Sequence, residues 1–132
     1  MLKIEKQTFY NDDCLKVMAG FEDKSVDVIV TSPPYNLQKD YGTYKDDLPY
    51  DEYLLWIRNL SEEFFRILRD DGSFFLNIGS MNKRPEMSME VCFEVMKFFK
   101  LQNHITWVKS ITIKGEAFDR VNNPKQIGRA HV

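Results

Sequence analysis

Six residues, Thr31 to Asn36 with the sequence Thr-Ser-Pro-Pro-Tyr-Asn, directly follow the apolar segment Val26–Val30. Proline lacks an N–H, fixes its own φ and drives the preceding residue toward extended geometry, so this run can neither pair as a strand nor begin a helix. The carbonyls of Ser32 and Pro33 therefore lack local donors and can point outward, beside the Ser32 hydroxyl and the flat Tyr35 ring. The pattern predicts a small set of hydrogen-bond acceptors beside an aromatic wall.

The elements around this run predict where it lies. Val26–Val30 is a short apolar stretch interrupted only by Asp27, which is typical of a buried parallel strand. The other expected elements are strands at Gln7–Tyr10, Ser73–Ile78 and Ile105–Val108, and helices at Cys14–Met18, 51–69 and Ser88–Lys100. Strands that alternate with helices indicate an α/β fold, a mostly parallel sheet flanked by helices. In such sheets ligands bind at the carboxyl ends of strands.

The longest expected helix has apolar residues at i, i+4, i+7 and i+8, namely Leu60, Phe64, Ile67 and Leu68. Gly72 follows, and we expect it to end the helix in a left-handed conformation. Beyond Lys109 the alternation stops, and we expect the remainder to be polar, basic and irregular.

Length and composition are those of one soluble globular domain: 132 residues, 43% hydrophobic and 29% charged. No apolar run approaches the roughly 20 residues that span a bilayer, and the N-terminus has no secretory signal. Cys14 and Cys92 form no close pair, so neither a disulfide framework nor a metal site is indicated. We therefore expect a cytoplasmic protein with no membrane partner.

The formal net charge of −2 conceals an asymmetry along the chain. Residues 1–96 carry 11 Lys and Arg against 18 Asp and Glu, whereas residues 97–132 carry 7 against 2. A basic distal segment can hold nucleic-acid phosphates. A solvated surface with a chance excess of lysine explains the same charges.

These residues resemble the amino-methylating DNA methyltransferases, the N4-cytosine/N6-adenine family, over about residues 7–110. The resemblance rests on 11–15 (Asn-Asp-Asp-Cys-Leu), on 25–37 with its Thr-Ser-Pro-Pro-Tyr motif, and on 69–78. It implies a Rossmann-like fold dependent on S-adenosylmethionine. It also implies methyl transfer to the exocyclic amine of a cytosine (N4) or adenine (N6) flipped out of double-stranded DNA.

The resemblance implies catalytic roles for Ser32, Pro33, Pro34 and Tyr35, and cofactor-binding roles for Asp13, Cys14 and Ser32. Acceptors at the two amine hydrogens favour the geometry and positive charge that develop as methyl arrives. The Ser32 oxygen and the Pro33 carbonyl are the candidate acceptors, and Tyr35 is the stacking platform. Asp13 is expected to approach the cofactor adenine beside the Cys14 N–H; the alternative for Asp13 is an Asx-turn or a helix N-cap.

The chain departs from the family at two places. Asp12 stands where the family often has glycine, and the six glycines include no Gly-x-Gly pair. The family binds the methionine part of the cofactor with a Phe-x-Gly-x-Gly loop, which lies C-terminal in one permuted branch. We therefore expect an N-terminal piece of such an enzyme, incomplete at its C-terminus, which alone binds S-adenosylmethionine weakly and does not turn over.

Several choices stay open. Serine at the first motif position favours cytosine over adenine as the target base. A restriction endonuclease is a candidate partner, and the oligomeric state does not follow from the sequence. The alternatives to an enzyme are an inactive remnant and a non-catalytic nucleic-acid-binding fold that uses the same pocket. A methyltransferase for small molecules or proteins is a third alternative.

We divide the chain into a catalytic part at 1–109, the start of a target-recognition region at 110–126, and a tail at 127–132. The tail, Ile-Gly-Arg-Ala-His-Val, is the translation of a widely used sequencing-adapter sequence. We expect it to be a processing scar rather than part of the natural sequence, which would leave Gln126 as the last natural residue read.

Overall fold

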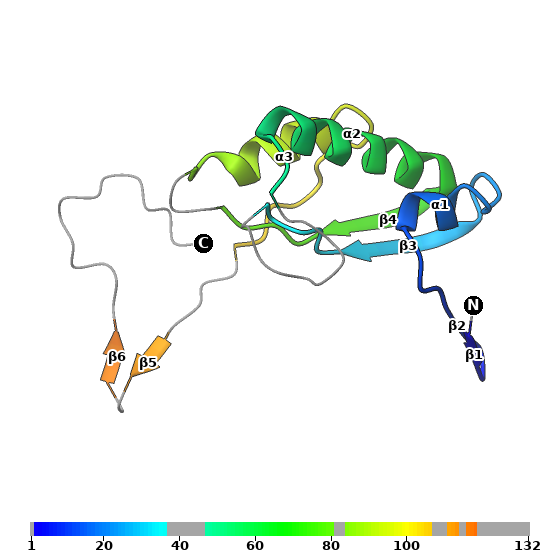
Figure 1. The fold of residues 1–132 in the computed structure, drawn as a ribbon, viewed down its shortest axis with the longest axis horizontal. Coiled ribbons are helices and arrows are strands. Elements are labelled where there is room, and N and C mark those ends of the chain that lie inside the picture. Colours follow the sequence, from blue (N-terminus) through cyan, green and yellow to red (C-terminus); the bar gives the residue numbers. More distant parts are fainter. Residues whose placement is uncertain (1, 37–46, 81–83, 107–110, 114–115, 119–132) are drawn as a thin grey trace.

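The computed structural model describes residues 2–36, 47–80, 84–106, 111–113 and 116–118. Its elements in chain order are β1 (Leu2–Ile4), β2 (Gln7–Phe9), α1 (Cys14–Met18), β3 (Val26–Thr31), α2 (Tyr50–Ile67), β4 (Leu68–Leu76), α3 (Met87–Val95), β5 (Ile111–Ile113) and β6 (Glu116–Phe118). Among these, β3 pairs with β4 in parallel, while β1–β2 and β5–β6 are antiparallel pairs. Figure 1 shows α2 and α3 above the parallel pair and the β1–β2 and β5–β6 pairs below it.

The segment β3–α2–β4 forms a β–α–β unit, the connection that parallel strands require. The register runs from Val28 opposite Ser73 to Thr31 opposite Leu76. Helix α2 passes directly into β4, because Leu68 already has extended backbone angles of φ −75° and ψ 136°. The carboxyl ends of the two strands therefore lie side by side, and the Asn77 N–H donates to the Thr31 carbonyl at 2.9 Å.

Gly72 lies inside β4, so the prediction that it caps the helix is wrong. The register shifts between Val26 opposite Leu68 and Val28 opposite Ser73, so β4 carries extra residues in a bulge. A Cβ at Gly72 would lie 2.9 Å from the Asp27 carbonyl oxygen and 2.9 Å from side-chain atoms of Leu68. Glycine is required here for close approach of the two strands rather than for a left-handed turn.

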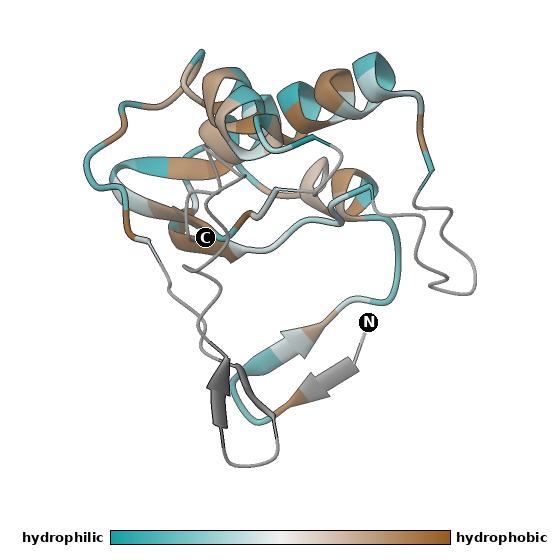
Figure 2. Cartoon of the chain, turned by 90° about the vertical axis from the view of Figure 1, so that its left-hand side faces the viewer, coloured by the Kyte–Doolittle hydropathy of each residue, from teal (hydrophilic) through white to brown (hydrophobic). Residues whose placement is uncertain are grey.

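Helices α2 and α3 cover one face of the parallel pair. The buried residues of this layer are Tyr53, Ile57, Met87, Val91 and Val95. Side chains alternate across a strand, so the opposite face carries Val28, Val30 and Phe75, which are 54%, 74% and 55% exposed. Figure 2 shows hydrophilic and hydrophobic colours alternating along both the strands and the helices. The described residues thus form an α/β arrangement with helices on one side of a parallel pair.

Most predicted elements are confirmed, with shifted ends. The helix at Cys14–Met18 matches residue for residue. The strand expected at Gln7–Tyr10 ends at Phe9 and pairs with β1 instead of joining the parallel sheet.

Two predictions about the distal part of the chain are wrong. Ile105 and Thr106 lie outside any strand, and residues 107 and 108 fall outside the described residues. Ile105 is 82% exposed, so its β-branched side chain has no packing surface to hold it in a strand. The stretch after Lys109, expected to be irregular, contains the antiparallel pair β5–β6.

Three further observations concern the described residues only. No helix among them is both long and apolar enough to cross a membrane. They also hold no cluster of three or more His, Cys, Asp or Glu side chains suited to a metal ion. Cys14 and Cys92 are free thiols.

Candidate active site

The diproline turn begins where β3 ends, as the sequence predicted. Ser32 is exposed, Pro33 is buried, and Pro34 and Tyr35 are half-buried. The Pro33 ring points toward α2, α3 and the end of β4. The turn is therefore anchored through Pro33 and presents Ser32 on the side away from the helices.

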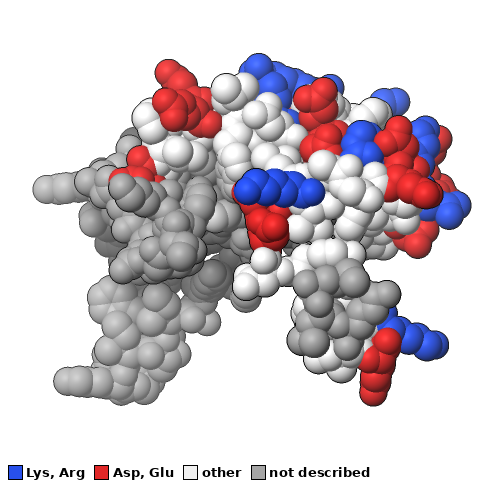
Figure 3. Space-filling view, turned by 45° about the vertical axis from the view of Figure 1, so that its right-hand side comes forward, with Lys and Arg blue, Asp and Glu red and all other residues white. Residues whose placement is uncertain are grey.

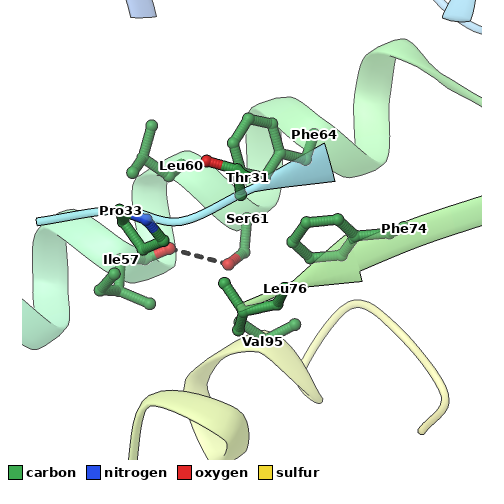
Figure 4. Close-up of a pocket in the computed structure, with 9 residues that line it drawn as sticks. All are labelled: Thr31, Pro33, Ile57, Leu60, Ser61, Phe64, Phe74, Leu76 and Val95. Atoms are coloured by element: carbon green, nitrogen blue, oxygen red, sulfur yellow. Dashed lines mark hydrogen bonds between the residues drawn. The ribbon is translucent and has the colours of Figure 1, made fainter. Parts of the chain in front are cut away.

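The space beneath Pro33 is a cavity of about 10 Å³. It is lined by Thr31, Pro33, Ile57, Leu60, Ser61, Phe64, Phe74, Leu76 and Val95, and Figure 4 shows these side chains converging from both layers. The Ser61 hydroxyl there donates to the Ile57 carbonyl at 2.8 Å instead of facing a ligand. A space this small holds about one water molecule. This space beneath Pro33 is therefore too small for a ligand much larger than water.

The structure brings together the two polar side chains of the turn. The Ser32 Oγ and Tyr35 Oη atoms are 3.1 Å apart, and the Tyr35 hydroxyl also donates to the Asn77 carbonyl at 3.4 Å. Because Tyr35 has one hydroxyl proton, donation to Asn77 makes Ser32 the donor in the Ser32–Tyr35 bond. The lone pairs of the Ser32 oxygen then remain available to accept a hydrogen bond from a ligand.

The Tyr35 ring lies against Gly79, just beyond the end of β4. A Cβ at Gly79 would be 3.3 Å from Tyr35 Cε2, so a larger residue would push the ring. The ring therefore reaches from the end of β3 to the end of β4, across the edge where ligands of parallel sheets bind. Gly79 did not stand out in the sequence, because only the tertiary structure places it against Tyr35.

The carbonyls of the turn differ in their hydrogen bonds. The Pro34 carbonyl accepts from the Tyr53 hydroxyl at 2.9 Å. No group among the described residues donates to the Pro33 carbonyl, the acceptor that the sequence singled out. Tyr53 is the second residue that sequence reasoning missed, since nothing in an apolar helix face indicates which carbonyl its hydroxyl meets.

Asn36 ends the motif in a left-handed conformation with φ 54°. Its side-chain amide donates to the Leu48 carbonyl at 2.7 Å, which ties the chain after the turn to the start of α2. Asparagine tolerates this backbone region better than other side chains. The local sequence thus fixes both ends of the turn.

Asp13 and Cys14 lie on a separate element. Asp13 caps α1: its Oδ1 atom accepts from the N–H groups of Leu15 and Lys16 at 3.0 and 3.2 Å. Partial burial and then the Asp13 charge raise the pKa of the Cys14 thiol, which keeps that sulfur neutral at pH 7. No hydrogen bond among the described residues joins this pair to the turn, so the predicted site residues form two groups.

Charge around these groups is mixed. Figure 3 shows Lys and Arg interspersed with Asp and Glu on the face it presents. Where the basic segment 97–132 begins, Lys97 pairs with Glu94 at 2.6 Å. The side chains from 107 onward lie outside the described residues, so a phosphate-binding role for this segment stays a prediction.

A β–α–β unit with a proline-rich turn and an aromatic side chain at its carboxyl edge is the arrangement expected of an α/β methyltransferase. Residues 26–128 match the N6/N4 methyltransferase family model, described as DNA methylase. The chain therefore belongs to the family of N4/N6 DNA methyltransferases.

Three relatives illustrate the match. Type II methyltransferase M.MjaVI of Methanocaldococcus jannaschii is 37% identical over 110 residues, covering 80% of this chain and 55% of that protein. M.BglII of Bacillus subtilis is 34% identical over 107 residues, 76% of this chain and 28% of that protein. M.HpaI of Haemophilus parainfluenzae is 39% identical over 67 residues, 51% of this chain and 21% of that protein. The chain spans about half or less of the length of each relative.

Proposed function

We propose that this chain carries the base-binding part of a DNA amino-methyltransferase, which transfers a methyl group to cytosine N4 or adenine N6 of a flipped base. The observation that carries the proposal is the turn at Ser32–Tyr35. It combines an exposed hydroxyl, a Pro33 carbonyl without a described donor and an aromatic ring, at the carboxyl edge of a parallel pair. The type II methyltransferases to which the chain is similar support DNA as the substrate.

The chemistry follows from the weak nucleophilicity of the exocyclic amine of the base. Its lone pair is delocalised into the base ring, which makes the nitrogen a poor nucleophile. The Ser32 oxygen and the Pro33 carbonyl would accept from its two N–H groups and so stabilise the positive charge that develops on nitrogen. S-adenosylmethionine, when bound, would supply the methyl group: the amine nitrogen would form the bond to the methyl carbon, the electrons of the donor's carbon–sulfur bond would remain on sulfur, and one amine proton would pass to water.

Tyr35 would offset part of the cost of flipping. Extruding a base from a duplex costs a few kcal/mol, and stacking on an aromatic ring returns about 1–3 kcal/mol per base. Contact with Gly79 fixes one side of the ring, while its hydroxyl is tied to Ser32 and Asn77. A ring held in this way fixes the orientation of the base. Correct alignment of the amine with the methyl group then raises the rate of transfer.

S-adenosylmethionine is the methyl donor that the family implies, and the residues of this chain fit its adenosine end. Asp13 uses one carboxylate oxygen to cap α1, which leaves the other able to accept from an adenine amine. The sequence contains no Gly-x-Gly segment for the methionine end. We therefore infer that the 132 residues alone bind the donor weakly and do not turn over.

We further propose that the described β–α–β unit belongs to a Rossmann-like sheet whose remainder lies C-terminal to this chain. In this proposal residues 1–109 are catalytic, 110–126 begin the target-recognition region, and 127–132 are the adapter-derived tail. A restriction endonuclease would be the biological partner, as for type II systems. Ser32 favours cytosine over adenine as the target.

The experiment that tests the function is product analysis. The complete reading frame is expressed, incubated with genomic DNA and a donor carrying a tritiated methyl group, and the DNA is digested to nucleosides. We expect label in N4-methylcytosine. Label in N6-methyladenine would correct the target base, whereas unlabelled DNA that nevertheless binds the protein would identify a non-catalytic nucleic-acid-binding protein or an inactive remnant. Methylation by the 132 residues alone would contradict the inference of an incomplete enzyme.

A further inference from the structure

A side-chain hydrogen bond ties the turn to α2 in addition to the packing of Pro33. Tyr53 is fully buried, and its hydroxyl donates to the Pro34 carbonyl at 2.9 Å across 19 residues of sequence. Two consecutive prolines have no N–H, so the turn makes few backbone hydrogen bonds of its own. Loss of this bond would leave the half-buried Pro34 carbonyl without its protein donor, which costs free energy. The Tyr53 hydroxyl is therefore a strong local constraint on where the Pro34 carbonyl points.

Tyr53 is itself held by neighbouring rings. Tyr50 stacks on it with ring centroids 6.1 Å apart and an interplanar angle of 29°, and the Trp56 ring centroid lies 6.1 Å from that of Tyr53. The Arg84 guanidinium carbon sits 3.6 Å from the Tyr50 ring centroid, and the Tyr50 hydroxyl donates to Glu90 of α3. Partial burial and the Glu90 carboxylate raise the pKa of Tyr50, so this donor keeps its proton. Contacts from both helices thus fix the Tyr53 ring.

The constraint on the Pro34 carbonyl also restricts the Pro33 carbonyl, the candidate acceptor that precedes it. Both proline rings lock their φ angles, the Pro33 side chain is buried, and the Pro34 carbonyl is fixed toward α2. The Pro33 carbonyl then has little freedom to turn. A reacting group misplaced by 1 Å can cost about a hundredfold in rate, so such a constraint matters for a site that aligns an amine.

We propose that Tyr53 is a positioning residue of this site: through the Pro34 carbonyl it holds the Ser32–Tyr35 turn in the geometry that receives the amine of the base. This rests on the proposed function. In this role Tyr53 acts on the site through the backbone of the turn rather than by direct contact with the base or the methyl donor. The hydroxyl is the part that matters, while the ring serves the core.

The test compares Tyr53→Phe, which removes the hydroxyl and keeps the stacked ring, with Tyr10→Phe, which removes a hydroxyl from a residue that is 48% exposed. The first readout is the carbonyl carbon signal of Pro34 in the 132-residue chain made with carbonyl-labelled proline. We expect Tyr53→Phe to shift it while Tyr10→Phe leaves it unchanged. Tyr50→Leu, which removes the ring that stacks on Tyr53, should shift it in the same direction if Tyr53→Phe fails to fold.

The second readout is methylation by the complete protein. Tyr53→Phe should lower kcat by roughly tenfold to a hundredfold with the KM for DNA nearly unchanged, because alignment rather than binding is lost. An unmoved Pro34 signal, or an active wild type whose kcat is the same in Tyr53→Phe, overturns the positioning role alone. A wild type that methylates nothing, with the Pro34 signal still shifted in the variant, overturns the proposed function and leaves the structural tie intact.

Discussion

Replacing Gly72 by alanine should loosen the parallel pair that carries the turn. The added Cβ would lie 2.9 Å from the Asp27 carbonyl oxygen and 2.9 Å from two Leu68 side-chain atoms. The Asp27 oxygen is backbone, so it can move only if β3 moves. Overpacking of this kind typically costs 1–3 kcal/mol, and we expect about 2 kcal/mol for Gly72→Ala. In a chain of this length that corresponds to a drop in Tm of about 6–10 °C.

The assay is thermal unfolding followed by circular dichroism, with Gly20→Ala as the matched control. A Cβ at Gly20 would meet only the Val17 carbonyl at 3.5 Å, an ordinary contact, so this change should be neutral or stabilise by up to about 1 kcal/mol. Equal Tm values for the two variants would refute the reasoning, because they would mean that β3 and β4 do not approach closely at Gly72.

Three further predictions concern other parts of the fold. Arg66→Met should lower the Tm by more than Arg69→Met in the same unfolding assay. Arg66 donates to the backbone carbonyls of Met18, which ends α1, and of Phe21 in addition to its carboxylate partners, whereas Arg69 pairs with exposed carboxylates. For Glu94, a hydrogen bond from an arginine of α2 holds the pKa of the carboxyl below its ordinary 4.5. The stabilisation from the ionised Glu94 carboxylate is thus present above pH 4.5 and lost as the pH falls through the lowered pKa. The difference in free energy of unfolding between wild type and Glu94→Gln should therefore be largest at pH 7 and vanish in acid. A difference that grew on acidification would contradict that sign. Gly79→Ala should move the aromatic NMR signals of Tyr35 at a cost below about 1 kcal/mol, since the ring needs to shift by only a few tenths of an ångström; unmoved signals would rule out the contact.

Local patterns predicted the elements well. The α1 helix follows from an Asp13 cap and a short apolar run, and the structure has the same bounds. The end of β3 follows from prolines that cannot continue a strand, and Ser32 is exposed there as expected. Such features depend on residues within a few positions of each other, so the sequence contains the information needed to predict them.

Contacts between distant segments were not predictable in this way. Gly72 follows a helical pattern, which predicted a helix cap. Its role is instead to allow close approach to the Asp27 carbonyl, 45 positions earlier in the sequence. Tyr53 belongs to the apolar face of a helix, and only the packing of α2 against the turn shows that its hydroxyl meets Pro34. The position of Asp13 relative to the turn likewise depends on how α1 packs against the rest of the chain. The sequence of α1 alone does not predict that packing.

The most direct test of the base-binding turn measures methylation and DNA affinity together in the complete protein. Ser32→Ala removes one acceptor, Tyr35→Ala removes the stacking ring, and Ser73→Ala changes an exposed serine of β4 as a control. We expect each of the first two variants to lose roughly a hundredfold or more in kcat, and the control to be unaffected. The Kd for DNA should stay near the wild-type value in Ser32→Ala and weaken by no more than the stacking contribution of about 1–3 kcal/mol in Tyr35→Ala. Methylation at the wild-type rate by either variant would contradict the proposed role of the turn.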